Sequence, residues 1–222
     1  MLLNLSKPIL YLITRGATTE ATTAAAPEFT QILNQISAAV AAGIDLIQIR
    51  EKQLTARVLF ELVSESRKLT RGSQTRLLVN DRADIAVGAS ADGVHLTTQS
   101  LDAATIRKTF GEQLLIGAST HSLDEVEAAR DSGADFAVFG PVFETESKIG
   151  FGSPKGLEEL SQVVRAVRGF PVLALGGVSG LNAADCLAAG ALGVAGIRLF
   201  DDPKDFISLL TALRHSGTNQ TI

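Results

Sequence analysis

The segment spanning residues 139–152, FGPVFETESKIGFG, carries two hydroxyls and one amine in close order. These are Thr145, Ser147 and Lys148, and they follow the apolar run 136–139, which is typical of a buried strand. Hydroxyl donors and a cation in a long loop at the end of a strand indicate a site for a phosphorylated ligand. A solvated surface loop is the alternative interpretation.

A second group of polar residues follows two other apolar runs. It comprises Arg50, Lys52, Asn80 and Asp81. With Lys148 as a third cation, this group predicts a pyrophosphate site in which Asp81 binds Mg²⁺. In the alternative interpretation, Arg50 and Lys52 pair with Glu51 and Asp81 in a surface network.

Glycines follow the last two apolar runs of the chain. Gly176 and Gly177 come after one run, and Gly196 precedes Ile197 at the end of the other. Glycine lets a phosphate approach the backbone N–H groups closely, which favours a monophosphate site here. Arg198 adds a cation and is expected to contact substrate. A glycine pair also occurs in tight turns, so a purely structural role stays open.

His121 follows Ser119 in a segment that is expected to lie at the site. A histidine at this position could act as a general acid or base, and a hydrogen-bonded structural role stays open. We expect Ser119 to contact substrate, but no neighbour in the sequence would activate it as a nucleophile. His95 lies inside a predicted strand, which favours a structural role.

Apolar runs alternate with segments of helical periodicity along the chain. We expect strands over residues 9–13, 44–49, 77–79, 94–96, 114–116, 136–139, 172–175 and 194–197. Eight mostly apolar strands, each followed by a helix, predict an α/β fold, a single-domain (β/α)8 TIM barrel. An open doubly wound sheet is the alternative, although eight parallel strands would more often need a larger chain. The barrel domain is expected over residues 1–214, with a polar C-terminal tail over 215–222.

Two features of the pattern link this fold to the polar residues. Glycines at positions 43, 93, 133 and 190 stand where a helix should stop and a strand begin, which is helix-termination chemistry. In such a barrel, the residues at the carboxyl ends of the strands converge on one end, where barrel enzymes place their active sites. The polar groups described above all lie at predicted strand ends.

Composition excludes several classes of protein. The chain has 222 residues and a net charge of −4, which argues against a general nucleic-acid binder. The single cysteine, Cys186, excludes an intrachain disulfide and fits a reducing compartment. No apolar run reaches membrane-spanning length and no signal peptide is recognisable, so we expect a cytoplasmic protein without a membrane partner. The expected partners are small phosphorylated molecules; a homo-oligomer is possible, and the sequence does not fix the oligomeric state.

With these residues assembled, the chain resembles the thiamine phosphate synthase and TenI superfamily. The similarity runs from YLITRG at Tyr11 to GIRLF ending at Phe200. It rests on the segments QIREK (48–52), VNDRADIA (79–86), ADGVHL (91–96), GASTHS (117–122), GADFAVFGPVFETESK (133–148) and LALGGV (173–178). The resemblance implies a (β/α)8 barrel, in agreement with the strand count.

The resemblance also implies an activity in thiamine biosynthesis. The synthase is a transferase that joins hydroxymethylpyrimidine pyrophosphate to thiazole phosphate, giving thiamine phosphate and pyrophosphate by a dissociative mechanism. By this resemblance, the pyrimidine pyrophosphate contacts Gln48, Arg50, Lys52, Asn80 and Lys148, and Asp81 binds Mg²⁺. The thiazole phosphate contacts Thr145, Ser147, Gly177 and the backbone near Ile197. Such chemistry requires stabilisation of the leaving group's charge more than a base or a nucleophile.

The chain departs from the family pattern at two positions. Ser100 stands where the synthases carry a second Mg²⁺ ligand, an Asp, and Asp102 is in the wrong register to replace it. Arg198 stands where they usually carry a small residue after the last strand. It would either strengthen phosphate binding or obstruct the thiazole site.

The phrase VFET together with THS also resembles the TenI branch. That branch implies a thiazole tautomerase, an isomerase in which His121 moves a proton without a metal. The chain keeps Lys52 and Asp81, which a tautomerase would not require, so the sequence favours the synthase. A non-catalytic regulator that binds a thiazole or thiamine phosphate is a third interpretation.

Overall fold

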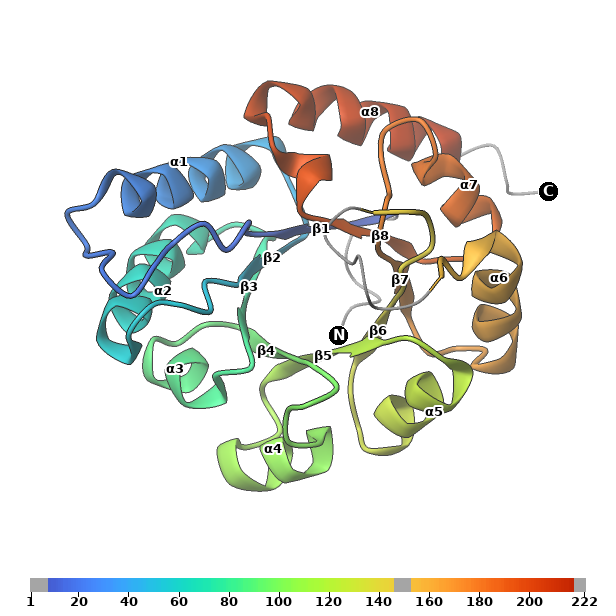
Figure 1. Ribbon diagram of the computed structural model, residues 1–222, viewed down its shortest axis with the longest axis horizontal. Helices are drawn as coiled ribbons and strands as arrows, with labels where there is room; N and C mark the ends of the chain where they lie inside the picture. Colours follow the sequence, from blue (N-terminus) through green and yellow to red (C-terminus); the bar gives the residue numbers. More distant parts are fainter. Residues whose placement is uncertain (1–7, 146–152, 218–222) are drawn as a thin grey trace.

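The computed structural model describes residues 8–145 and 153–217 as a barrel of strands inside a ring of helices (Figure 1). The strands are β1 (Ile9–Ile13), β2 (Leu46–Ile49), β3 (Arg76–Asn80), β4 (Gly93–Leu96), β5 (Leu115–Thr120), β6 (Phe136–Phe139), β7 (Val172–Ala174) and β8 (Gly193–Gly196). The α-helices are α1 (Pro27–Ala42), α2 (Ala56–Thr70), α3 (Ala83–Gly88), α4 (Ala103–Phe110), α5 (Leu123–Asp131), α6 (Gly156–Ala166), α7 (Ala183–Ala188) and α8 (Phe206–Gly217). Two short 3₁₀ helices, η3 (Arg198–Phe200) and η4 (Pro203–Asp205), separate β8 from α8.

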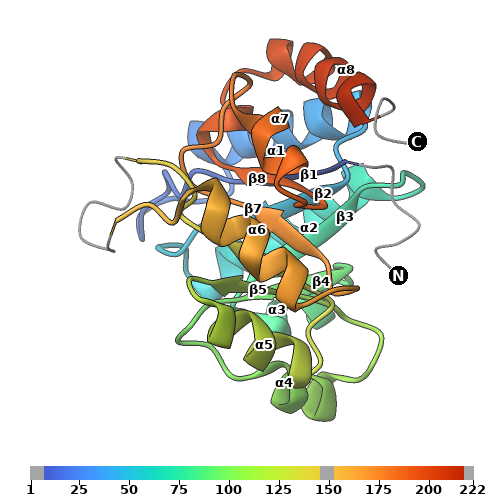
Figure 2. The same ribbon diagram turned by 90° about the vertical axis from the view of Figure 1, so that its right-hand side faces the viewer.

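The sheet is parallel and closed. Each strand pairs with the next one along the chain, and β8 pairs with β1, where Ile9 lies opposite Gly193. The predicted (β/α)8 barrel is therefore confirmed, and the open sheet is wrong, because an open sheet would leave β1 and β8 as edges. In the side view the helices pack against the outer face of the strands (Figure 2). No helix among the described residues is long and apolar enough to cross a membrane.

Strand side chains alternate between two apolar cores. In β1, Ile9, Tyr11 and Ile13 point into the barrel interior, whereas Leu10 and Leu12 pack against the helices outside. The interior cluster also takes Leu46 of β2, Leu78 of β3, Leu115 of β5 and Phe136 of β6. This alternation decides which polar residues face inward, because a residue two positions after an inward apolar one shares its face.

The helix-stopping role predicted for glycine holds at three of the four junctions. Gly43 has φ 83° and donates its N–H to the last carbonyls of α1, and Gly133 and Gly190 also have positive φ. Gly93 instead begins β4, where a Cβ would lie 2.0 Å from the carbonyl oxygen of Leu115. Close packing of two strands, rather than helix termination, therefore requires glycine at position 93.

The last helix is longer than apolar periodicity suggests. The sequence pattern ends at Leu213 and places a polar tail from residue 215, but α8 continues to Gly217. Helical backbone hydrogen bonds require no apolar side chain, so the periodic pattern can stop before the helix does. Residues 218–222 lie outside the described residues.

Three aspartates tie the amino ends of the strands together; we call this end the rim. Asp45, Asp92 and Asp135 immediately precede β2, β4 and β6, and each accepts the backbone N–H of the second residue of the preceding strand. The distances from N to the carboxylate oxygen are 2.9, 2.9 and 2.7 Å. Each carboxylate also pairs with an arginine, namely Arg214, Arg76 and Arg107 in turn.

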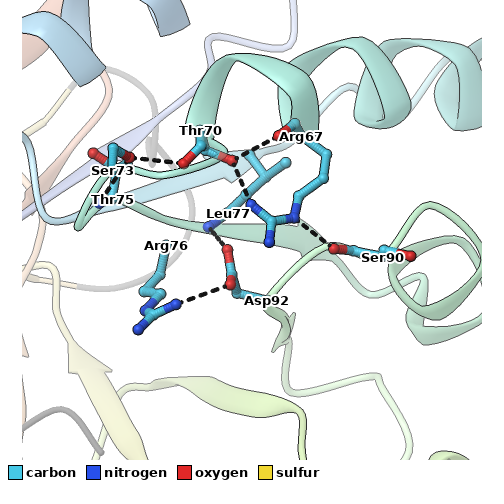
Figure 3. Close-up of polar contacts among 8 residues, drawn as sticks. All are labelled: Arg67, Thr70, Ser73, Thr75, Arg76, Leu77, Ser90 and Asp92. Carbon is cyan, nitrogen blue, oxygen red and sulfur yellow. Dashed lines mark hydrogen bonds and ion pairs between the residues drawn. The ribbon is translucent and has the colours of Figure 1, made fainter.

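Figure 3 shows the middle example of the three. Asp92 accepts from Leu77 N through one oxygen and from Arg76 Nη1 through the other, at 3.2 Å. Nearby, Arg67 donates to the carbonyl of Ser90 at 2.8 Å and so joins α2 to the segment before β4. These polar contacts join neighbouring strands, and α2, along the rim.

Candidate active site at the carboxyl ends of the strands

The end of the barrel opposite the rim is here called the mouth, and the predicted site residues lie there on several strands. Gln48, Asn80, His95 and Ser119 each stand two positions after an inward-facing residue of β2, β3, β4 and β5. The strand period of two therefore turns all four side chains inward at the mouth. The geometry brings together residues that are up to 71 positions apart in the sequence.

A buried chain of hydrogen bonds crosses this part of the barrel. Gln48 Nε2 donates to the Tyr11 hydroxyl at 2.9 Å, and that hydroxyl lies 3.2 Å from His95 Nδ1. On the other side of the ring, His95 Nε2 lies 3.0 Å from Ser119 Oγ. Tyr11, Gln48 and His95 are almost fully buried, so these contacts are shielded from water.

The amide of Gln48 determines which group donates in each hydrogen bond of this chain. Because Gln48 donates to Tyr11, the Tyr11 proton goes to His95 Nδ1, and Nε2–H then donates to Ser119 Oγ. Burial, and then the charge of Arg50, lowers the pKa of His95 to about 3, which keeps the ring neutral. Burial raises the pKa of Tyr11.

The fold gives Ser119 a histidine neighbour that lies far from it in the sequence. His95 is a direct neighbour, brought there by the register of β4 and β5. Its Nε2 donates to Ser119 rather than accepting a proton, however, so it cannot serve as a general base for that hydroxyl. The conclusion that Ser119 is not a nucleophile therefore follows, and the hydroxyl keeps its proton.

Arg50 and Lys52 do not form the surface network that was the alternative interpretation. Across the described residues, no carboxylate lies within 4.0 Å of either cation. Arg50 is half-buried, Lys52 is exposed, and Glu51 between them is only 3% exposed. Because β2 ends at Ile49, strand geometry does not continue through the two cations. Both charges remain available to an anionic ligand.

Asp81 stands at the mouth beside Ser100. Asp81 has φ 62° and an exposed side chain, and Ser100 Oγ donates to its Oδ1 at 2.5 Å. Asp102 accepts from Thr105 N at 2.7 Å as the N-cap of α4, so it is engaged elsewhere. Asn80, next to Asp81, is half-buried at the inward end of β3.

The opposite side of the mouth is formed by the segments after β6, β7 and β8. Arg198 Nη2 donates to Thr145 Oγ1 at 3.1 Å, which joins two residues predicted to bind phosphate. At Gly177, φ is 65° and a Cβ would lie 2.4 Å from the carbonyl oxygen of Glu144. Close packing of the loops thus requires glycine at position 177. Ile197, after β8, packs against the interior cluster. Ser147 and Lys148 lie outside the described residues.

His121 is held by two hydrogen bonds at the end of β5. Its ring Nδ1 donates to the carbonyl of Gly140 at 2.5 Å, and its backbone N donates to Glu125 Oε2. This contact fits the tautomer that carries its proton on Nδ1 and a lone pair on Nε2. At the start of α5, Ser122 Oγ accepts from Glu125 N and so caps the helix that follows His121.

Comparison with known proteins identifies the family. The family model described as thiamine monophosphate synthase matches residues 10–200. The chain belongs to this family. A putative thiamine-phosphate synthase of Geobacter sulfurreducens is 43% identical over 82% of this chain and 86% of its own length. A thiamine-phosphate synthase of Moorella thermoacetica is 40% identical over 84% and 88%.

A solved structure supports the same assignment. The thiamine phosphate pyrophosphorylase of Pyrococcus furiosus superposes with a TM-score of 0.80 at 29% identity, covering 95% of this chain and 98% of that one. The fold and the family expected from the sequence are therefore both confirmed. The roles of individual residues in this thiamine monophosphate synthase family member stay predictions.

Sequence reasoning left three residues of the site without a role. Tyr11 was taken as part of an apolar run, His95 as structural, and Glu51 as a partner of its neighbouring cations. A signal was present for the first two, because each is a polar group at an inward position of a strand. No local sequence pattern indicated that Glu51 is buried, because its hydrogen-bond donors, Gly16 and Thr18, lie in a different segment of the chain.

Proposed function

We propose that this chain is a thiamine-phosphate synthase, a transferase of thiamine biosynthesis. The observation that carries the proposal is the 40–43% identity to named synthases over more than four fifths of both chains. Arg50 and Lys52 support it, because neither has a carboxylate within 4.0 Å among the described residues and the reaction releases a pyrophosphate. The substrates are hydroxymethylpyrimidine pyrophosphate and thiazole phosphate.

In the proposed reaction, the bond between the pyrimidine methylene carbon and the pyrophosphate oxygen breaks first. The electron pair leaves with the pyrophosphate, whose charge is stabilised by Arg50, Lys52 and Lys148. The lone pair of the thiazole nitrogen then forms the new carbon–nitrogen bond to the pyrimidine-stabilised cation. The charges of these residues matter most while the carbon–oxygen bond is breaking, which makes them catalytic in this proposal.

Orientation of the two substrates is assigned to the remaining polar groups. Gln48 and Ser119, joined through Tyr11 and His95, present an amide and a hydroxyl donor of fixed direction to the pyrimidine. Asn80 contacts the pyrophosphate. Thr145, Ser147, Gly177, Ile197 and Arg198 hold the thiazole phosphate.

The residues present would bind Mg²⁺ weakly by themselves and more tightly together with a substrate. Within residues 8–145 and 153–217, no three His, Cys, Asp or Glu side chains gather as a metal site. Asp81 offers one carboxylate, with Ser100 as its hydroxyl neighbour. Mg²⁺ is commonly bound by one or two carboxylates plus substrate phosphates, so Asp81 and the pyrophosphate fit it. The metal would supply additional charge stabilisation for the leaving group.

Titration of both substrates with and without Mg²⁺ tests the proposal. Pyrophosphate release is expected only when both substrates and Mg²⁺ are present. Lack of turnover under those conditions would refute the synthase. Metal-independent isomerisation of a thiazole carboxylate phosphate, lost in His121→Gln, would instead establish the tautomerase. Binding of thiazole phosphate without either reaction would indicate a regulator.

A further inference from the structure

A buried carboxylate lies between the two cations that follow β2. Glu51 is 3% exposed, although Arg50 before it and Lys52 after it reach the surface of the mouth. An ionised carboxylate in such a position is costly unless donors or cations compensate its charge. Among the described residues, no cation pairs with Glu51, so neutral donors provide this compensation.

The donors come from the segment that joins β1 to α1. Gly16 N donates to Glu51 Oε1 at 3.0 Å, and Thr18 donates to Oε2 through both its backbone N, at 3.2 Å, and its hydroxyl, at 2.7 Å. Thr18 is itself 4% exposed. Three converging donors on one carboxylate therefore fasten the β1–α1 segment to the end of β2.

The fastened segment also contacts Arg50. A Cβ placed on Gly16 would lie 3.1 Å from the carbonyl oxygen of Arg50 and 3.4 Å from its Nη1. Thr14, at the start of the same segment, accepts from Arg50 N at 2.8 Å. The carbonyl oxygen and the guanidinium of Arg50 thus lie beside Gly16, which Glu51 holds in place, and the Arg50 N–H donates to Thr14 in the same segment.

We propose that Glu51 is a positioning residue for the pyrophosphate sub-site. Its carboxylate holds the β1–α1 segment, and that segment fixes the Arg50 guanidinium in the orientation that meets the leaving group. Recognition of phosphate oxygens by Arg depends on the plane of its donors, so a small displacement weakens binding. This inference rests on the proposed function, because it assigns Arg50 to the pyrophosphate.

A double-mutant cycle tests the inference by calorimetry with inorganic pyrophosphate in Mg²⁺. Glu51→Gln places an amide donor against the Thr18 donors and is expected to weaken pyrophosphate binding about tenfold. Arg50→Ala is expected to weaken it about thirtyfold. If Glu51 acts through Arg50, the double variant should bind no more weakly than Arg50→Ala. Additive losses, of about 300-fold, would overturn the inference, as would unchanged binding in Glu51→Gln.

Three controls keep the outcomes distinct. Glu61→Gln makes the same chemical change on α2, where Glu61 pairs with Arg57 at the surface, and is expected to leave pyrophosphate binding unchanged. If Glu51→Gln does not fold, Thr18→Val removes a single hydrogen bond and is expected to weaken binding about threefold, again only when Arg50 is present. An unchanged affinity in Thr18→Val would then count against the inference. Absence of pyrophosphate binding in the unaltered protein would refute the proposed function itself.

Discussion

The rim of the barrel pairs its three aspartates with arginines, whereas two cations of the mouth, Arg50 and Lys52, lack such a partner among the described residues. At the rim, Asp45, Asp92 and Asp135 each accept a strand N–H and pair with an arginine. At the mouth, Arg50 and Lys52 have no carboxylate within 4.0 Å among the described residues. Charges whose partners lie within the fold contribute to stability, whereas charges without them are available to a ligand.

The rim and the mouth differ in how regularly their contacts repeat from strand to strand. At the rim, each aspartate occupies the position before an even-numbered strand, so one local arrangement recurs at β2, β4 and β6 and fails at β8, which follows Leu192. At the mouth, the hydrogen bonds join loops and strand ends of different sequence, and no single arrangement recurs from one strand to the next. A substitution at the rim should therefore change stability with little effect on catalysis, and a substitution at the mouth should do the reverse.

The largest expected effect is at the mouth. Arg50→Ala should lower kcat/KM for pyrophosphate release roughly 100-fold to 1,000-fold, because the leaving group loses a charged donor. The midpoint of urea unfolding should stay close to that of the unaltered protein, since no ion pair within the described fold is broken. Steady-state kinetics and urea titration measure the two quantities. A large loss of stability with full activity would contradict the division between mouth and rim.

The next effect is at the rim. Asp92→Ala should lower the free energy of unfolding by about 2 kcal/mol, because Leu77 N and Arg76 lose their acceptor. Asp92→Asn keeps an oxygen for Leu77 N and should cost about half as much. Turnover of the folded protein should be unchanged in both variants. Equal losses in the two variants would show that the hydrogen bond to Leu77 contributes nothing.

A third prediction concerns pH. Burial raises the pKa of Asp45 from 3.8 to about 6, so between these values the folded state binds the proton more tightly than the unfolded state does. Stability from this group is therefore greatest at low pH and falls as the pH rises towards 6. Asp45→Asn removes this dependence and should gain about 2 kcal/mol relative to the unaltered protein between pH 4 and pH 7.

Urea unfolding at both pH values provides the measurement. A constant difference between Asp45→Asn and the unaltered protein would show that Asp45 titrates as an ordinary surface carboxylate.

The smallest effect tests the metal at the mouth. Ser100→Asp places a second carboxylate beside Asp81 and should tighten Mg²⁺ binding to the ligand-free protein about tenfold. Ser100→Asn has a similar size without the charge and should leave Mg²⁺ affinity unchanged. Calorimetry with Mg²⁺ alone gives both values. Equal affinities for the two variants would indicate that Asp81 and residue 100 do not share a metal.

Much of the site could be predicted because the end of an apolar run in the sequence marks the end of a strand. Gln48, Asn80 and Ser119 were placed at the mouth from apolar runs alone, and the barrel confirms their positions. Their partners were not predictable in the same way. Ser119 meets His95 only because β4 and β5 pair with His95 opposite Gly117, and no local pattern contains that register.

The sequence by itself predicted eight strands, favoured a closed parallel barrel over an open sheet, and indicated the end at which polar residues gather. Those features depend on hydrophobic periodicity, which is a property of short stretches of chain. Only the tertiary structure decided that Glu51 is buried beneath Gly16 and Thr18, 33 to 35 positions away, while its two neighbours stay exposed to a ligand. Such pairings depend on the stagger of strands around a closed barrel, which adjacent residues do not encode.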